Sequence, residues 1–252
     1  MDKVFKLKQR LQQIADSLKT NPNGLGLLGL GSAGKEIERM DEYSDLDFFA
    51  IVAEGYKQAF IDDLSWLSDL HDIAWCFKNT VDGYKLLFSD GVFCEFAVFE
   101  PNELAHIEYS EGQFVWRDAS VNETLKVPLK QSNSFNTDEA YLLGELLSNL
   151  YVGLCRMKRG ELISATRFIQ VYALDRLINL LDLRFPGAQS HLTDKFCLDR
   201  RVEQRHPQLQ PLLLECSQGA AGNIESARAM LTYVCEHYCV NADLEAEIKA
   251  LL

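Results

Sequence analysis

The sequence predicts a mixed α/β fold for the first half of the chain and an all-helical bundle for the second. In the first hundred residues, short apolar stretches of strand character alternate with helical segments. After about residue 125, long runs with helical spacing of apolar residues take their place. We therefore expect two domains, residues 1–125 and residues 126–252. A chain of 252 residues has the length of one or two domains.

The first half is expected to mix helices and strands. An amphipathic helix is predicted over residues 3–19, ended by Asn21-Pro22-Asn23-Gly24. A helix is also expected over residues 56–70. Turn signals such as Ser89-Asp90-Gly91 separate the predicted strands. These strands cover residues 25–30, 46–52, 73–78, 83–88 and 92–99. The second strand is apolar on both faces, as a central buried strand would be.

The second half is expected to be helical throughout. Asn136 and Glu139 form a candidate capping box before a helix that runs to Lys158. A second helix is predicted over residues 161–183, stopped by Pro186-Gly187. Shorter helices are predicted near residues 191–204, 209–217, 223–239 and 242–251. The stretch 108–135 is left undefined.

The negative charge of the chain is concentrated in the first half. The formal net charge is −12. Residues 1–125 hold 11 basic and 22 acidic residues, a net of −11, whereas residues 126–252 hold 14 and 15, a net of −1. A nucleic-acid-binding protein would show the reverse, because Lys and Arg carry phosphate affinity. If the acidic half handles a phosphorylated ligand, we expect a divalent cation to mediate the contact.

Composition also bears on the compartment. No stretch approaches the ~18–20 apolar residues of a spanning helix, and the first ten residues are too charged to open a signal peptide. The seven cysteines are an odd number spread along a chain that can build a core. We expect a cytoplasmic protein without a disulfide framework and without a membrane partner.

Two carboxylates lie two residues apart where the predicted central strand begins. Asp45 and Asp47 project from one face of that strand, because successive side chains alternate, while Leu46 and Phe48 point to the other. Carboxylates held this close repel each other unless a cation lies between them. Oxygen ligands suit Mg²⁺, so we expect both residues to hold magnesium that carries a nucleoside triphosphate.

A glycine-serine pair upstream supplies a complementary phosphate site. Gly31 lets the backbone approach a phosphate closely, and the Ser32 hydroxyl can donate to it. A helix that began here would direct its positive end toward the same phosphate. Lys35 would add a charge-assisted contact, although the segment around it also fits an exposed helix of mixed charge.

A third acidic residue is expected, and Glu95 is the candidate. It lies in an otherwise apolar strand, so its carboxyl group must be neutral, paired or coordinated. If it faces the aspartate pair, Glu95 would complete the metal site and act as general base on an acceptor hydroxyl.

This arrangement resembles the DNA-polymerase-β-like nucleotidyltransferase superfamily. Its signature is a Gly-Ser pair, a loop, an acidic-hydrophobic-acidic triplet on a strand, and a later acid on a neighbouring strand. Here these are Gly31-Ser32, Asp45-Leu46-Asp47 and Glu95. The triplet with the preceding Tyr43-Ser44 is similar to the antibiotic nucleotidyltransferases. Several stretches resemble the lincosamide branch in particular: residues 31–35, 41–45, 95–99, 148–150 and 158–161.

The resemblance implies a fold and an activity. The fold is a nucleotidyltransferase domain with a small mixed sheet flanked by helices, followed by a helical domain that helps to form the acceptor site. The activity is Mg²⁺-dependent transfer of a nucleoside monophosphate, usually AMP from ATP, to a hydroxyl of a small molecule, with release of pyrophosphate. The acceptor would be a lincosamide- or aminoglycoside-type antibiotic. Members are often dimers, so a homodimer is also an expectation.

Two basic clusters lie in the helical half. Lys158 and Arg159 are candidates for nucleotide binding, and capping of a helix C-terminus is the competing interpretation. Arg200, Arg201 and Arg205 are expected to form a solvated face.

Two other functions stay open. The fold could serve as a catalytically silent module that senses nucleotides or binds a protein. Alternatively, the transfer could modify a protein hydroxyl, as in AMPylating, antitoxin-like nucleotidyltransferases.

Overall fold

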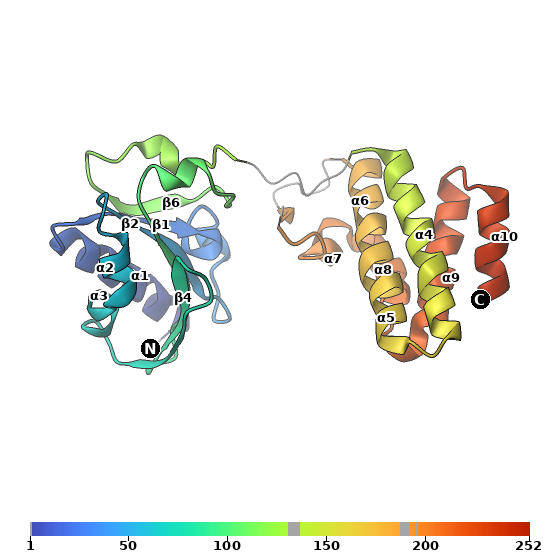
Figure 1. Cartoon of the computed structure of the whole chain (residues 1–252), viewed down its shortest axis with the longest axis horizontal. Coiled ribbons are helices and arrows are strands. Elements are labelled where there is room, and N and C mark those ends of the chain that lie inside the picture. The colour runs from blue at the N-terminus through green and yellow to red at the C-terminus, as the bar shows by residue number, and fades with distance from the viewer. Residues whose placement is uncertain (1, 131–136, 187–191, 195) are drawn as a thin grey trace. The chain divides into compact units, whose positions relative to one another are not determined.

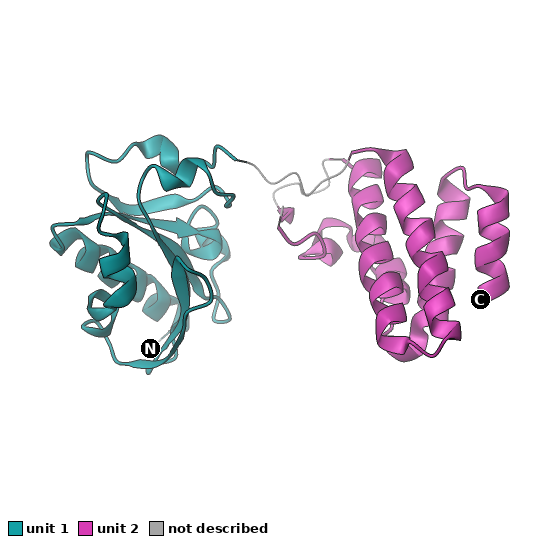
Figure 2. Ribbon diagram, in the orientation of Figure 1, with its two compact units in different colours: residues 1–132 teal, residues 133–252 magenta. Residues whose placement is uncertain are grey.

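The computed structural model describes residues 2–130, 137–186, 192–194 and 196–252 (Figure 1). They form two compact units, Met1–Ser132 and Asn133–Leu252 (Figure 2). The division falls within the stretch 108–135, which the sequence leaves undefined. The first unit combines a sheet with helices, and the second is helical in the residues described, so the predicted fold class is confirmed.

The first unit is built on one six-stranded sheet. Its strands are β1 (Gly24–Leu30), β2 (Leu46–Val52), β3 (Ile73–Phe77), β4 (Gly83–Phe88), β5 (Phe93–Phe99) and β6 (Gln113–Arg117). Their order across the sheet is β3-β4-β5-β2-β1-β6. Strands β2 and β5 pair in parallel, and the other neighbouring pairs are antiparallel. Its helices are α1 (Lys3–Thr20), α2 (Lys57–Asp62) and α3 (Ser65–Ser68).

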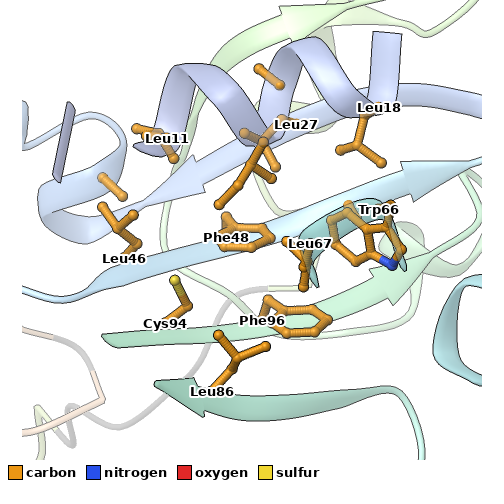
Figure 3. Packing of buried hydrophobic residues seen from close by; sticks show 14 of the residues in the cluster. Leu11, Leu18, Leu27, Leu46, Phe48, Trp66, Leu67, Leu86, Cys94 and Phe96 are labelled. Atoms are coloured by element: carbon orange, nitrogen blue, oxygen red, sulfur yellow. The ribbon is translucent and has the colours of Figure 1, made fainter. Parts of the chain in front are cut away.

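The main core of this unit lies between the sheet and these helices. Alternation in β2 directs Leu46 and Phe48 into it, and both are essentially inaccessible to solvent. The ring of Phe48 stacks on that of Phe96 from β5, with centroids 5.3 Å apart, and meets the edge of Trp66 from α3 (Figure 3). Because Leu46 and Phe48 face the core, Asp47 between them lies on the opposite face of the sheet.

One expectation for this unit is wrong, and one strand was not predicted. The single helix over residues 56–70 is two short helices, because Asp63 is extended and its carboxylate accepts a hydrogen bond from the Ser65 N–H. The strand β6, which pairs with β1, lies in the stretch for which no element was predicted.

The second unit is a bundle of helices. The helices are α4 (Glu139–Lys158), α5 (Leu162–Arg167), α6 (Leu174–Arg184), α7 (Val202–Arg205), α8 (Gln210–Cys216), α9 (Asn223–His237) and α10 (Ala242–Leu251), with a π-helical turn over Phe168–Ala173 that joins α5 to α6. Asp138 caps α4 by accepting a hydrogen bond from the Tyr141 N–H. The predicted cap Asn136 and the predicted stop Gly187 lie outside the described residues. Of the helix expected near 191–204, the described part is helical only from Val202 on.

A buried ionic cluster ties α6 to the segment that contains α7. The guanidinium of Arg205 is 1% exposed and donates to both carboxylate oxygens of Asp182, at 3.2 Å each. His206 is also 1% exposed, and its Nε2 lies 2.7 Å from the same carboxylate. The expectation that Arg205 belongs to a solvated face is therefore wrong, because its charge is neutralised inside the unit. Arg200, by contrast, is 49% exposed.

Membrane insertion finds no support in the helices. Among the residues the structure describes, none of the helices combines the length and the apolar character needed to cross a bilayer.

Candidate functional site

The loop after β1 folds back tightly on the strand it leaves. Gly31 has a φ of 48°, in the left-handed region that favours glycine. A Cβ at Gly34 would lie 2.1 Å from the Gly29 carbonyl oxygen, so no side chain fits there. The helix that could have begun here is only a three-residue 3₁₀ turn, Gly31–Ala33, and supplies no helix N-terminus for a phosphate. Ser32 is 3% exposed, which places it beneath the loop surface.

A tight turn leads from this loop into β2 and positions the aspartates. The Asp41 carboxylate accepts hydrogen bonds from the Tyr43 N–H at 2.9 Å and the Ser44 hydroxyl at 3.0 Å. Asp45 follows the turn, and Asp47 is the second residue of β2. Both are partly exposed, whereas Leu46 between them is fully buried. The sequence thus forms the turn locally and leaves both aspartates on the open side of the sheet.

Glu95 lies beside Asp47 on the neighbouring strand. The two residues are register partners in the parallel pairing of β2 with β5, so they share a face of the sheet. The Glu95 carboxylate accepts a hydrogen bond from the Asn79 side chain at 2.9 Å and lies 3.2 Å from the Lys85 ammonium. Its side chain is 42% exposed. The sequence allows this carboxyl group to be neutral, paired or coordinated, and in the structure it is paired.

The carboxylates are adjacent in register without forming a closed metal cage. Within the described parts of the chain, no three His, Cys, Asp or Glu side chains gather closely enough to hold a metal ion. The Glu95 carboxylate is paired with Lys85 instead. The donor set of Asp45, Asp47 and Glu95 fits Mg²⁺ chemically, since three carboxylates on one face are the oxygen ligands this ion prefers.

A basic residue that the sequence analysis did not single out lies near Asp47, while nucleotide binding by Lys35 stays a prediction. The ammonium of Lys35 pairs with Glu111, and both side chains are largely exposed. Arg39 pairs with Glu36 and, unlike Lys35, lies against Gly31. Its Nη2 lies 3.1 Å from the point that a Cβ on Gly31 would occupy, and Asp47 Oδ2 lies 4.0 Å from the same point. Arg39 therefore flanks the glycine loop together with an aspartate of the site.

Sequence reasoning missed Arg39 and Lys85 for different reasons. Arg39 lies in a segment interpreted as an exposed helix, whereas the structure shows a 3₁₀ turn over Ile37–Arg39. Lys85 is the only charged residue of β4, which was a usable signal, but its pairing with Glu95 depends on a register that the sequence does not reveal.

Cys94, next to Glu95, faces the core and not the carboxylates. It points into the core and is fully buried. Burial raises the pKa of its thiol far above the ordinary value, and the negative charges of Asp45 and Asp47 raise it further. The thiol stays protonated and is no nucleophile.

Lys158 and Arg159 lie in the second unit, where α4 ends. Both are exposed. Gly160, with a φ of 80°, and the Glu161 N–H, which donates to the Arg156 carbonyl at 3.0 Å, close the helix end. Neighbouring Arg156 stacks on the ring of Phe168 and pairs with the Ser164 hydroxyl. Binding of a nucleotide by Lys158 or Arg159 stays a prediction.

A comparison with solved structures finds a distant structural likeness. No family model and no curated protein matches the chain. The chain is similar to the crystal structure of an aminoglycoside 6-adenyltransferase from Bacillus subtilis, with 11% sequence identity and a TM-score of 0.33. The match covers 96% of this chain and 95% of that chain. A likeness at this level gives no residue correspondence, so the roles below are argued from this chain's own side chains.

Proposed function

We propose that this chain transfers a nucleoside monophosphate, AMP from ATP, to a hydroxyl of a small molecule of the lincosamide or aminoglycoside type. One observation carries the proposal. Asp47 and Glu95 are register partners on parallel strands, and the Asp47 carboxylate borders the Gly31 loop. Carboxylates for a cation and a glycine loop for phosphates thus adjoin on one open face, together with the sequence signature Gly31-Ser32 and Asp45-Leu46-Asp47.

In this proposal the residues of the chain bind, orient and accept a proton. Asp45 and Asp47 would hold Mg²⁺, with Glu95 as the third ligand, and the ion would neutralise charge on the triphosphate. The acceptor oxygen bonds to the α-phosphorus, the bond from that phosphorus to the β-phosphate bridging oxygen breaks, and pyrophosphate leaves. The hydroxyl proton passes to the Glu95 carboxylate, which Asn79 holds in place. Positioning and charge neutralisation supply most of the rate enhancement.

The experiment that tests this proposal is a screen for pyrophosphate release. ATP, GTP, CTP and UTP are each incubated with Mg²⁺, the protein and lincomycin, clindamycin, streptomycin or spectinomycin. We expect release with at least one pair, and an acceptor whose mass increases by one nucleoside monophosphate. Transfer of label from ATP to a macromolecule of a cell lysate would favour a protein-modifying enzyme instead. Binding of nucleotide without any transfer would favour a silent module.

Replacing Arg39 by Gln is expected to weaken binding of Mg·ATP about 10- to 100-fold. Arg39 borders the glycine loop beside Asp47, and a hydrogen bond to a charged phosphate contributes about 1.5–3 kcal/mol. Lys35→Gln should cause a smaller loss, because the Lys35 side chain is 57% exposed against 33% for Arg39, so solvent screens its charge more. Isothermal titration calorimetry with a non-hydrolysable ATP analogue measures both.

Lys126→Gln is the matched control for Arg39→Gln. Lys126 is also a basic residue in a 3₁₀ turn and pairs with an acid three positions earlier, Glu123. It should bind the analogue like the wild type. Equal affinities for Arg39→Gln and Lys126→Gln would remove Arg39 from the proposed site.

A further inference from the structure

An uncovered apolar surface adjoins the carboxylates. Four residues of β3, β4 and β5 form it, which we call the apolar floor: Trp75, Phe77, Leu87 and Phe93. None of them belongs to the hydrophobic clusters of the described chain. Trp75 and Phe77 are 48% and 55% exposed, and their rings stack with centroids 6.2 Å apart. A contiguous exposed apolar surface is a feature of ligand-binding and protein-binding sites.

Strand register places the apolar floor on the same face as Asp47 and Glu95. One row across the sheet runs from Phe77 through Lys85 and Glu95 to Asp47. The row beside it runs from Trp75 through Leu87 to Phe93. Strands lie about 4.8 Å apart, so Phe77 is about 10 Å from Glu95, a span that a molecule of two linked rings covers.

Another part of this sheet face is covered, which sets the apolar floor apart. Phe49 and Ala97, two residues further along β2 and β5, pack against a core cluster that includes Leu104 and Tyr109. Leu87 and Phe93 are half-buried and have no such cover. This face of the sheet is therefore covered at Phe49 and Ala97, beyond the carboxylates. It is open at the apolar floor, beside the carboxylates.

Sheet order places the floor on the acceptor's side of the reaction. Gly31 follows β1, on one side of β2, whereas β5, β4 and β3 lie on the other side. With the departing phosphates at the Gly31 loop, an in-line displacement requires the attacking hydroxyl to approach from the opposite side of the α-phosphorus. That direction leads over Glu95 to the apolar floor.

We propose that the apolar floor binds the acceptor, a ring compound with one apolar face, a free hydroxyl and no negative charge. The inference rests on the proposed function and specifies its acceptor. The aromatic pair packs against the apolar face of the ring, and the hydroxyl reaches Glu95. The charge of the occupant follows from its surroundings, since residues 1–125 carry a net charge of −11 and three carboxylates, against the ammonium of Lys85, adjoin the floor.

Binding of lincomycin, as the probe, to the full chain tests the inference without depending on turnover. Calorimetry is run with Mg²⁺ and a non-hydrolysable ATP analogue. Phe77→Ala is expected to weaken lincomycin binding about 10-fold or more and to leave affinity for the analogue unchanged. Phe5→Ala, which removes a ring that is 56% exposed on α1, is the matched control and should bind lincomycin like the wild type.

A conservative variant guards against misfolding of the edge strand. Trp75→Phe keeps a ring and should bind lincomycin within a few-fold of the wild type, but it should lose most of the change in tryptophan emission on binding. Equal lincomycin affinity of Phe77→Ala and the wild type, or no binding by the wild type, would overturn the inference. So would a dimer that dissociates in Phe77→Ala with unchanged lincomycin affinity, since the floor would then join two copies.

If the proposed transfer reaction is wrong but the apolar floor binds a ligand, the experiments give a different result. Lincomycin binding that depends on Phe77, with no pyrophosphate released from any nucleoside triphosphate, would keep the floor as a ligand site. It would remove the proposed transfer reaction alone.

Discussion

Replacing Asp47 by Asn is expected to reduce nucleotidyl transfer at least about 10³-fold without unfolding the protein. Asp47 is partly exposed on the open face of β2, so its charge is not needed for the core. The charge stabilisation that a bound metal supplies is worth several kcal/mol, and each 1.36 kcal/mol is a factor of ten in rate. Pyrophosphate release under saturating nucleotide and acceptor measures the loss.

Asp16→Asn provides the control for this change. Asp16 is an exposed carboxylate on α1, where it accepts a hydrogen bond from Gln12. Its variant should keep the wild-type rate. Transfer by Asp47→Asn at a rate near that of Asp16→Asn would show that Asp47 holds no catalytic metal.

Replacing Asp182 by Ala is expected to lower the free energy of unfolding of the second unit by about 3–5 kcal/mol. The change leaves the Arg205 guanidinium buried without its carboxylate, and removal of one partner of a buried pair is strongly destabilising. Arg205 would keep only neutral acceptors, the carbonyls of Leu198 and Arg200 at 2.7 Å. Urea unfolding followed by far-ultraviolet circular dichroism measures the effect, with separate transitions fitted for the two units.

Glu203→Ala is the matched comparison. Glu203 is an exposed acid on α7, close in sequence to Arg205, and its loss should change stability by no more than about 0.5 kcal/mol. A loss below about 1 kcal/mol for Asp182→Ala would mean that water or another group neutralises Arg205.

Local patterns in the sequence predict most of the first unit. Helical spacing identifies α1, and apolar runs bounded by turn residues identify five of the six strands. The strand β6 is missed because its five residues are mostly half-buried and show no clear alternation. The break between α2 and α3 is missed because it depends on one local hydrogen bond from Ser65 to Asp63.

The sequence points to the acidic residues of the candidate site but not to its basic residues. Asp45, Asp47 and Glu95 follow from spacing and chemistry, and the structure brings Asp47 and Glu95 into register. The positions of Lys85 and Arg39 depend on strand pairing and on a loop that folds back on β1, which are contacts between distant residues. Such contacts leave no periodic trace in the sequence.

The ionic cluster of the second unit is not predicted for the same reason, because it depends on contacts between residues distant in the sequence. An arginine next to other basic residues is usually solvated, and nothing near Arg205 in the sequence indicates burial. Its partner Asp182 lies on a different helix, α6. Only the tertiary structure shows that the two charges meet.

A crystal structure of the protein with Mg²⁺ and a non-hydrolysable ATP analogue tests the central claim most directly. We expect oxygen atoms of Asp45, Asp47 and Glu95 at about 2.1 Å from magnesium, with the triphosphate along the Gly31 loop and Lys85 released from Glu95. A bound analogue with these three carboxylates turned away from the metal, and Glu95 still paired with Lys85, would contradict it.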